Sequence, residues 1–341
     1  MKKITGWGFV GTSTIAREHM LAAVRAQPGQ EVVAVASGDL DRARAFAQTQ
    51  GIPRACVGID ALLAEPDVDA VYISSTNDLH RAQALAAIAA GKHVLCEKPL
   101  AMSVDDARQM VDAARRVGVV FATNHHLRNA ATHRKVRELV AAGAIGKPLF
   151  ARVFHAIYLR PQVQGWRIDS TRSGGGVIFD IGVHTVDALR FALQAEPVEA
   201  IGMSQTGPLS RNGVEDGMMA VLRMDTGVLA QIHAAYTVRY ADTGFEVHGD
   251  AGSVVARDCM TVRPAGDVTL RNADGEAVVP IEHGGLYAAG VSRFCAAMAN
   301  EGSPAASGDD GIRSLQGAIA IAQACRTGGM VPIAAPASPA W

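Results

Sequence analysis

The chain has 341 residues, of which 49% are hydrophobic and 19% are charged, and its formal net charge is −1. A prior of about 100–200 residues per domain favours two domains, and the hydrophobic fraction suits a globular protein with a substantial core. The near-zero charge, without a basic block or an acidic tail, argues against nucleic acid or an anionic membrane as the main partner.

No segment is expected to cross or enter a membrane. The longest apolar run, "LAAIAAGKHVL", is interrupted by Lys92 and His93 and is shorter than the ~20 residues that span a bilayer. The first residues lack the apolar stretch and cleavage site of a signal peptide, so we predict a cytoplasmic protein. The cysteines are scattered and lack C-x-x-C spacing, which predicts reduced thiols and neither a disulfide framework nor a zinc site.

The first 124 residues alternate between short hydrophobic runs and amphipathic helical stretches. Five runs predict strands because they are rich in Val, Ile or aromatic residues: "ITGWGFV", "EVVAVAS", "VDAVYISS", "KHVLCE" and "GVVFATN". Their nearly continuous hydrophobicity is typical of a parallel sheet that is buried on both faces. With the helical stretches between them, they predict an α/β domain over residues 1–124, a Rossmann doubly wound parallel sheet.

From about Leu149, the alternation of predicted strands and helices gives way to successive strand-like runs. Strand-like runs such as "LFARVFHAIY" and "GVLAQIHAAYTV" are joined by turn signals such as "DTG", "GDAG" and "NADG". We predict that residues 125–341 form an α+β domain with a mostly antiparallel open sheet. Helices around 184–194, 286–302 and 310–328 are expected to cover one face of it. An exposed opposite face could pair with a second copy, so a monomer and a homo-oligomer through this sheet are both open.

The stretch "GFVGTSTIA", residues 8–16, resembles a G-x-G-x-x-G dinucleotide fingerprint between a strand and a helix. Such a loop needs a tight turn, a close approach of the backbone to the pyrophosphate, and close packing of helix on strand. Gly11 can supply the turn and Ala16 the packing, whereas Ser13 replaces the middle glycine. Its hydroxyl could donate to a phosphate oxygen, and the helix N-terminus offers further N–H donors. A structural turn without a ligand is the alternative.

The end of the second strand favours NADP(H) over NAD. An NAD site has an acidic residue there that binds the ribose hydroxyls, whereas "VVAVAS" ends in Ser37. Arg42 follows five residues later, and a hydroxyl with a guanidinium suits a ribose 2′-phosphate. In the alternative interpretation, Asp39 or Asp41 binds an NAD ribose and Arg42 is merely solvated.

The loop "STNDLH", residues 75–80, follows the third predicted strand, at the edge where a doubly wound sheet binds its ligand. Asn77 and His80 could reach a cofactor there. A helix cap is the alternative, because Asp78 occupies an N-cap position before "LHRAQALAAIAAG".

Two segments carry the candidate catalytic groups. Lys98 of "EKP" follows a buried strand, where it could hydrogen-bond a carbonyl or exchange protons, and a surface turn is the alternative. Asp180 and His184 are four residues apart, so on a helix they share one face and suit a general acid or base beside a carboxylate. A metal site is the rival interpretation. We predict none, because no third ligand has a useful spacing and the adjacent His125 and His126 cannot both project the same way.

Together, these motifs resemble the Gfo/Idh/MocA family of sugar and polyol oxidoreductases. The resemblance rests on the Rossmann start, "EKPLA", "NHHLRN", "GWR" and "GGGVIFDIGVH", and it extends over essentially the whole chain. Longer runs such as "GTSTIAREH", "STNDLHRAQ", "HVLCEKPLAM" and "VEDGMM" are similar to a subgroup that uses NADPH to reduce a cyclic keto sugar. The resemblance implies that Lys98, Asp180 and His184 form the catalytic set.

The resemblance also implies a set of contacts to NADP(H). These are Thr12, Ser13, Thr14, Ile15, Ser37, Gly38, Arg42, Ser75, Thr76, Asn77, Asp78, Leu79, His80, Glu97, Lys98, Asn124, Trp166, Arg167 and Tyr287. Within this set, Ser37 and Arg42 match the residues that select NADPH in the subgroup. The chain departs from the subgroup at Gly38 and Asp39, where the subgroup has small hydroxyl residues.

We therefore expect an enzyme that reduces a small-molecule cyclic keto sugar with NADPH. His184 would donate the proton, Lys98 would hydrogen-bond the carbonyl oxygen and Asp180 would orient these donors, with the roles of Lys98 and His184 open to exchange. One alternative is an NAD(P)-dependent inositol or pyranose dehydrogenase. A second, of a different class, is a non-catalytic NAD(P) sensor or transcriptional co-repressor on the same fold.

Overall fold

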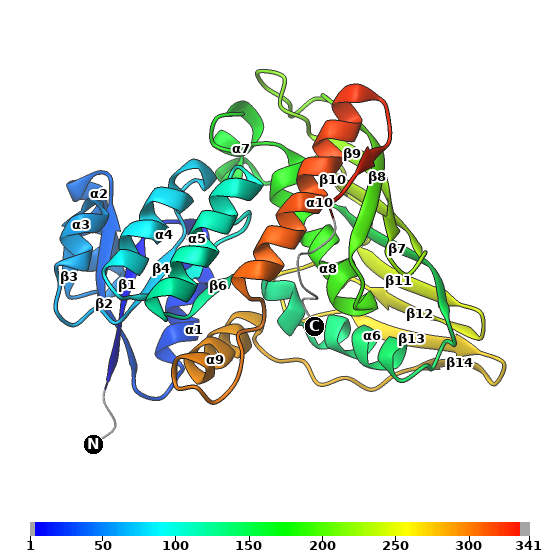
Figure 1. Cartoon of the computed structure of the whole chain (residues 1–341), viewed down its shortest axis with the longest axis horizontal. Helices are drawn as coiled ribbons and strands as arrows, with labels where there is room; N and C mark the ends of the chain where they lie inside the picture. Colours follow the sequence, from blue (N-terminus) through cyan, green and yellow to red (C-terminus); the bar gives the residue numbers. More distant parts are fainter. Residues whose placement is uncertain (1–3, 335–341) are drawn as a thin grey trace. The chain divides into compact units, whose positions relative to one another are not determined.

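The structure, a computed structural model, describes residues 4–334. The chain divides into two compact units, whose elements are labelled in Figure 1. The first unit runs to His125 and also takes in Tyr287–Ile312, a segment outside the predicted 1–124 domain. The second unit contains His126–Leu286 and the described residues from Arg313 onward.

The first unit is built on a six-stranded parallel sheet of order β3-β2-β1-β4-β5-β6. Its strands are β1 (Thr5–Val10), β2 (Gln30–Ser37), β3 (Arg54–Val57), β4 (Ala70–Ile73), β5 (His93–Cys96) and β6 (Phe121–Thr123). The strand order reverses between β1 and β4, and ligands of such sheets bind at the carboxyl ends of the strands beside this point. The predicted Rossmann fold is confirmed, and β3 is an edge strand that the sequence patterns did not reveal.

The helices of this unit begin and end at local signals. They are η1 (Ala16–Met20, a π-helical turn), α1 (Leu21–Arg25), α2 (Leu40–Gln50), α3 (Gly58–Leu63), η2 (Asn77–Leu79), α4 (His80–Ala89) and α5 (Val104–Val117). Helix α5 is capped by Ser103, whose side chain accepts a hydrogen bond from the Asp106 N–H at 3.1 Å. It ends at Gly118, which has a φ of 79°. Ser103 and Gly118 therefore mark the two ends of this helix.

Helix α9 (Leu286–Met298) contributes to the core of the first unit. Phe294 is fully buried, and its ring centroid lies 5.5 Å from that of Trp7 on β1. The prediction that residues 286–302 cover the second sheet was therefore wrong. An apolar stripe shows that a helix packs on something, but not which sheet receives it, and here the receiving surface is the one around Trp7.

The second unit contains a nine-stranded sheet of order β14-β13-β12-β11-β7-β10-β9-β8-β15. Its strands are β7 (Pro148–Ala156), β8 (Pro197–Gln205), β9 (Gly217–Met224), β10 (Leu229–Ala235), β11 (Gly244–Gly249), β12 (Gly252–Arg257), β13 (Asp267–Asn272), β14 (Gly275–Val278) and β15 (Val331–Pro332). Only the central pair β7 and β10 is parallel. The predicted mostly antiparallel sheet is confirmed.

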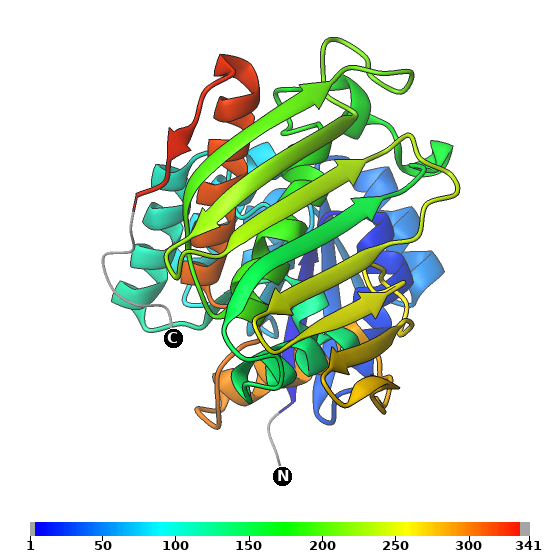
Figure 2. The same cartoon turned by 90° about the vertical axis from the view of Figure 1, so that its right-hand side faces the viewer.

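Helices of the second unit pack on one face of this sheet (Figure 2). The helical segments are η3 (His126–Asn129), α6 (Ala131–Ala141), η4 (Pro161–Val163), α7 (Trp166–Asp169), η5 (Ile178–Gly182, a π-helical turn), α8 (Val183–Leu193) and the part of α10 (Gly308–Thr327) from Arg313. Among the described residues of this unit, no helix covers the opposite face (Figure 2). We call this the open sheet face; its exposed apolar side chains include Phe150, Ile201, Met203, Met219, Val221 and Val278.

Within residues 4–334, no helix is both long and apolar enough to cross a membrane. The five cysteines are free thiols, and burial raises the pKa of Cys259 to about 12.

His133 on α6 is a buried ionisable group in the second unit. It is 1% exposed, and its ring centroid lies 5.8 Å from that of Phe245. Its Nδ1 lies 3.2 Å from the Thr132 hydroxyl and its Nε2 lies 3.3 Å from the Met260 sulfur. Burial lowers the pKa of His133 from 6.5 to about 4, because the surrounding apolar groups disfavour a charged ring.

We expect His133 to make the protein sensitive to acid. The unfolded chain binds a proton on this ring at higher pH than the folded chain does, so protonation favours the unfolded state. The resulting loss of folding stability is absent well above pH 6.5 and grows as the pH falls toward 4. The two pKa values limit the cost to about 3 kcal/mol. Urea unfolding at about pH 7 and pH 5 should show that wild type loses roughly 2 kcal/mol more than His133→Phe. Equal losses in the two proteins would assign the acid sensitivity to other groups.

Candidate functional site

The loop after β1 makes a tight turn. Gly11 has a φ of 99°, and a Cβ at this residue would lie 2.9 Å from the backbone of Ser74. The Ser13 hydroxyl donates to Ser74 Oγ at 2.8 Å and accepts from the Ala16 N–H at 3.1 Å. Ala16 is fully buried, as its packing position requires. Ser13 therefore caps the helix and ties the loop to the end of β4, while the first helical turn keeps N–H groups for an anion.

The end of β2 brings Ser37 and Arg42 together. Arg42 Nε donates to Ser37 Oγ at 2.8 Å. Asp39 caps α2, since its Oδ1 accepts from the Arg42 N–H at 2.7 Å, and Asp41 lies 3.7 Å from Arg44. The two carboxylates of the alternative interpretation thus have partners on their own helix, whereas the hydroxyl and the guanidinium lie side by side at the strand end.

The loop of residues 75–80 is tied to the turn that carries Lys98. His80 is fully buried, with Nδ1 2.9 Å from the Pro99 carbonyl and Nε2 3.2 Å from the Ser75 carbonyl. Burial lowers the pKa of His80. Asp78 does not cap α4, whose N-terminus has no side-chain cap. Its Oδ1 is buried and has no hydrogen-bond partner among residues 4–334, so a ligand donor fits this position.

Glu97, Lys98 and Asn124 lie at the carboxyl ends of β5 and β6. Glu97 Oε1 accepts from the Tyr72 hydroxyl at 2.7 Å and from Asn124 Nδ2 at 2.6 Å. Burial raises the pKa of Glu97, and these two hydrogen bonds oppose the rise. The following Lys98 is half-buried. The edge formed by the carboxyl ends of the strands therefore carries a carboxylate, an amine and an amide.

Tyr287 is the one predicted contact that comes from α9. It is 5% exposed and stacks on His19 of η1, with ring centroids 4.7 Å apart. Burial raises the pKa of Tyr287. His19 and Tyr72 were not predicted as site residues. In the sequence, one resembles an ordinary helix residue and the other an ordinary buried strand residue.

Asp180 and His184 lie on consecutive turns of η5 and α8 in the second unit, whereas Lys98 belongs to the first unit. Asp180 Oδ2 accepts from the Tyr236 hydroxyl at 2.9 Å and lies 3.2 Å from Arg167 Nε. Burial and the charge of Asp180 raise the pKa of Tyr236. His184 is 7% exposed, and its ring meets that of His126 edge to face at 4.9 Å.

The "GWR" and "GGG" motifs pack against each other and so place Asp180. Gly176 has a φ of 109°, and its N–H donates to the Arg167 carbonyl at 2.8 Å. The Arg167 guanidinium lies over the Trp166 ring at 4.8 Å. Glu215 Oε1 accepts from the Ile178 N–H at 3.2 Å. Sequence reasoning missed Tyr236 and Glu215, because neither belongs to a motif near Asp180 in the chain.

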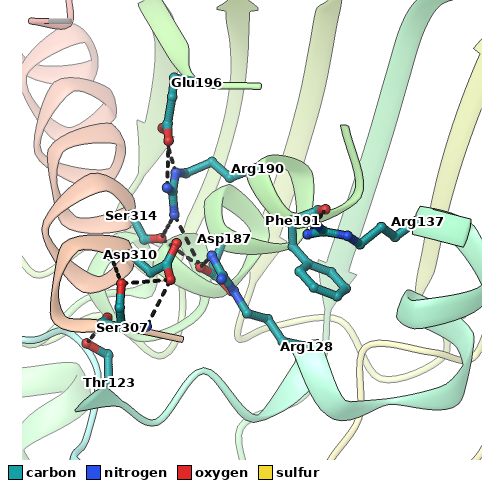
Figure 3. Close-up of polar contacts among 10 residues, drawn as sticks. All are labelled: Thr123, Arg128, Arg137, Asp187, Arg190, Phe191, Glu196, Ser307, Asp310 and Ser314. Carbon is teal, nitrogen blue, oxygen red and sulfur yellow. Dashed lines mark hydrogen bonds and ion pairs between the residues drawn. The ribbon is translucent and has the colours of Figure 1, made fainter. Parts of the chain in front are cut away.

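A buried ionic network anchors α8 (Figure 3). Asp187 accepts two hydrogen bonds from Arg128, both at 2.8 Å, and one from the Ser314 hydroxyl at 2.9 Å. Arg190 is fully buried and makes two hydrogen bonds to Glu196, both at 2.7 Å. The network joins η3, α8 and α10 within the second unit. It therefore holds the helix whose first turn carries His184.

Metal ligation is the rival interpretation of Asp180 and His184. Among the described residues, no group of three or more His, Cys, Asp or Glu side chains is arranged to hold a metal ion.

Two family models match the chain. An oxidoreductase family with an NAD-binding Rossmann fold matches residues 5–125, and the GFO/IDH/MocA C-terminal domain matches residues 133–255. A curated relative, 1,5-anhydro-D-fructose reductase of Ensifer adhaerens, is 52% identical over 322 residues, which cover 94% of this chain and 96% of the relative.

Two solved structures share the fold over nearly the whole chain. An aldose-aldose oxidoreductase from Caulobacter crescentus, complexed with glycerol, has a TM-score of 0.88 at 25% identity and covers 97% of this chain and 100% of its own. A 3-ketoreductase from Actinomadura kijaniata, in complex with TDP-benzene and NADP, has a TM-score of 0.80 at 27% identity. The match covers 94% of this chain and 97% of the ketoreductase chain. The family models, the curated relative and the fold confirm the predicted resemblance. The chain therefore belongs to the Gfo/Idh/MocA oxidoreductase family.

Proposed function

We propose that the protein is an NADPH-dependent reductase that converts a cyclic keto sugar, 1,5-anhydro-D-fructose, to 1,5-anhydro-D-mannitol. The observation that carries the cofactor assignment is the hydrogen bond of 2.8 Å between Arg42 and Ser37, beside an Asp39 that is engaged as a helix cap. The name of the 52% identical relative supports the substrate.

The chain's own residues would bind the sugar and supply the proton. The bound cofactor supplies the hydride that reduces the ketone carbon. His184 donates a proton to the developing alkoxide and Lys98 hydrogen-bonds the same oxygen, or these two roles are exchanged. Asp180 orients the donors and is itself oriented by Tyr236 and Arg167.

A direct assay separates this proposal from its alternatives. NADPH oxidation is followed with a panel of keto sugars that includes 1,5-anhydro-D-fructose, and NAD(P)⁺ reduction with inositols and pyranoses. Turnover in the second assay alone would favour a polyol or pyranose dehydrogenase. Tight NADPH binding without turnover in either assay would favour a cofactor sensor or co-repressor.

Arg42→Ala should weaken NADPH binding by about 10- to 100-fold and NADH binding by less than about 3-fold. The reason is that only NADPH carries the 2′-phosphate, and charge-assisted hydrogen bonds to it contribute roughly 1.5–3 kcal/mol. Dissociation constants for both cofactors, measured by fluorescence titration, check this. Arg44→Ala is the matched control, since Arg44 is an exposed arginine two residues further along α2. Equal losses for the two cofactors would contradict the assignment.

For the oligomeric state, we keep both proposals that the sequence left open: a monomer, and a homo-oligomer that forms through the second sheet. The open sheet face supports the second form, because Met203 is 80% exposed and lies beside Met219 in the sheet register. A cytoplasmic location and the absence of a nucleic-acid partner stay predictions.

A further inference from the structure

Tyr72 is a buried tyrosine of β4 that the proposed mechanism does not use. Its side chain is 0% exposed, and its ring packs on Phe9 with centroids 5.0 Å apart. The hydroxyl points to the carboxyl end of the sheet, where it donates to Glu97 Oε1 at 2.7 Å. The strand "AVYI" is otherwise apolar, so this hydroxyl is the polar side-chain group that it brings to the ligand-binding edge.

Glu97 is held from both sides. In the sheet, β5 lies between β4 and β6. The carboxylate that follows β5 therefore accepts from Tyr72 on one side and from Asn124, just after β6, on the other, the latter at 2.6 Å. Its own backbone N–H donates to the Ile73 carbonyl at 2.9 Å. Main chain and side chain of Glu97 are thus both fixed.

Both donors use the same carboxylate oxygen. Oε1 accepts the hydrogen bonds from Tyr72 and Asn124, so Oε2 is the oxygen that neither of these side chains uses. Burial raises the pKa of Glu97, and the hydrogen bond from Tyr72 is one of the groups that oppose this rise. The hydroxyl therefore favours both one orientation and the ionised form of the carboxylate.

We propose that Tyr72 is a positioning residue for the cofactor: it holds Glu97 through Oε1, so that Oε2 accepts a hydrogen bond from a hydroxyl of the bound dinucleotide. The inference rests on the proposed function in one respect, the assignment of Glu97 as a cofactor contact. It needs neither the identity of the sugar nor the choice of NADPH over NADH.

Tyr72→Phe removes the hydroxyl and keeps the ring. Binding of both NADPH and NADH, measured by fluorescence titration of the full chain, should weaken by about 10-fold, which corresponds to about 1.4 kcal/mol. Equal effects are expected because the two cofactors differ only in the 2′-phosphate, which Glu97 is not proposed to contact. Phe294→Leu is the control for core packing: Phe294 lies in the same buried cluster as Tyr72, so the change should lower the melting temperature and leave both dissociation constants within about 2-fold.

Tyr72→Phe in a Glu97→Ala background distinguishes a positioning role of the Tyr72 hydroxyl from a purely structural role. If Tyr72 acts through Glu97, Tyr72→Phe adds no further loss of cofactor affinity there. Unchanged affinity in Tyr72→Phe, or equal losses with and without Glu97, would overturn the inference. If wild type binds cofactor but reduces no sugar, the proposed substrate fails while the inference about Tyr72 stands; if wild type binds neither cofactor, both fail.

Discussion

His184→Ala should lower kcat for the keto sugar by about 100- to 10,000-fold while NADPH binding stays close to wild type. The imidazole is the proposed proton donor, and a methyl group can neither donate nor stabilise the developing charge. Steady-state NADPH oxidation and a separate fluorescence titration measure the two effects. His248→Ala is the control, because His248 lies on β11 and contacts Ser253 and Glu246. Near wild-type turnover in His184→Ala would refute the assignment.

A lysine series distinguishes the two possible proton donors. Lys98→Ala should also reduce kcat by at least about 100-fold. If Lys98 only hydrogen-bonds the oxygen, Lys98→Arg keeps a charged donor and should recover much of the activity. If Lys98 itself gives up the proton, Lys98→Arg should be as inactive as Lys98→Ala, because a guanidinium keeps its proton.

Arg190→Leu should lower the free energy of unfolding by about 3–5 kcal/mol. The change leaves Glu196, which is 4% exposed, as a buried carboxylate without its guanidinium. Arg223→Leu is a matched control, since Arg223 Nε also bonds a glutamate, Glu199, at 2.8 Å, but at the surface. It should cost less than about 1 kcal/mol. Urea unfolding of the three proteins gives the comparison.

The double variant Arg190→Leu with Glu196→Leu tests the reason for that loss. Removal of both charges also removes the cost of burying a lone one, so the double variant should be more stable than Arg190→Leu alone. If Arg190→Leu lowers the free energy of unfolding no more than Arg223→Leu does, burial does not increase the contribution of this ion pair to stability. If the double variant is less stable than the single, the loss comes from packing around the removed side chains.

Most of the parallel sheet of the first unit was predictable because its signals are local. Five hydrophobic runs with helices between them specify a parallel sheet, and Gly11, with a φ of 99°, is needed at a turn only two residues before Ser13. Ser37 and Arg42 are five residues apart, so the strand end and the first turn of α2 bring them together. The same holds for the Ser103 cap of α5. In each case, residues close in sequence determine the geometry.

The sequence by itself therefore determined the fold class, the tight turn after β1 and the polar pair at the end of β2. The tertiary structure alone decided which sheet receives α9, and that Tyr72 meets Glu97 and Tyr236 meets Asp180. Tyr236 is 56 residues from Asp180, and Tyr72 is 25 residues from Glu97. Hydrophobic periodicity shows that such a side chain is buried, but not where its hydroxyl points, because that depends on which strands become neighbours when the sheet assembles.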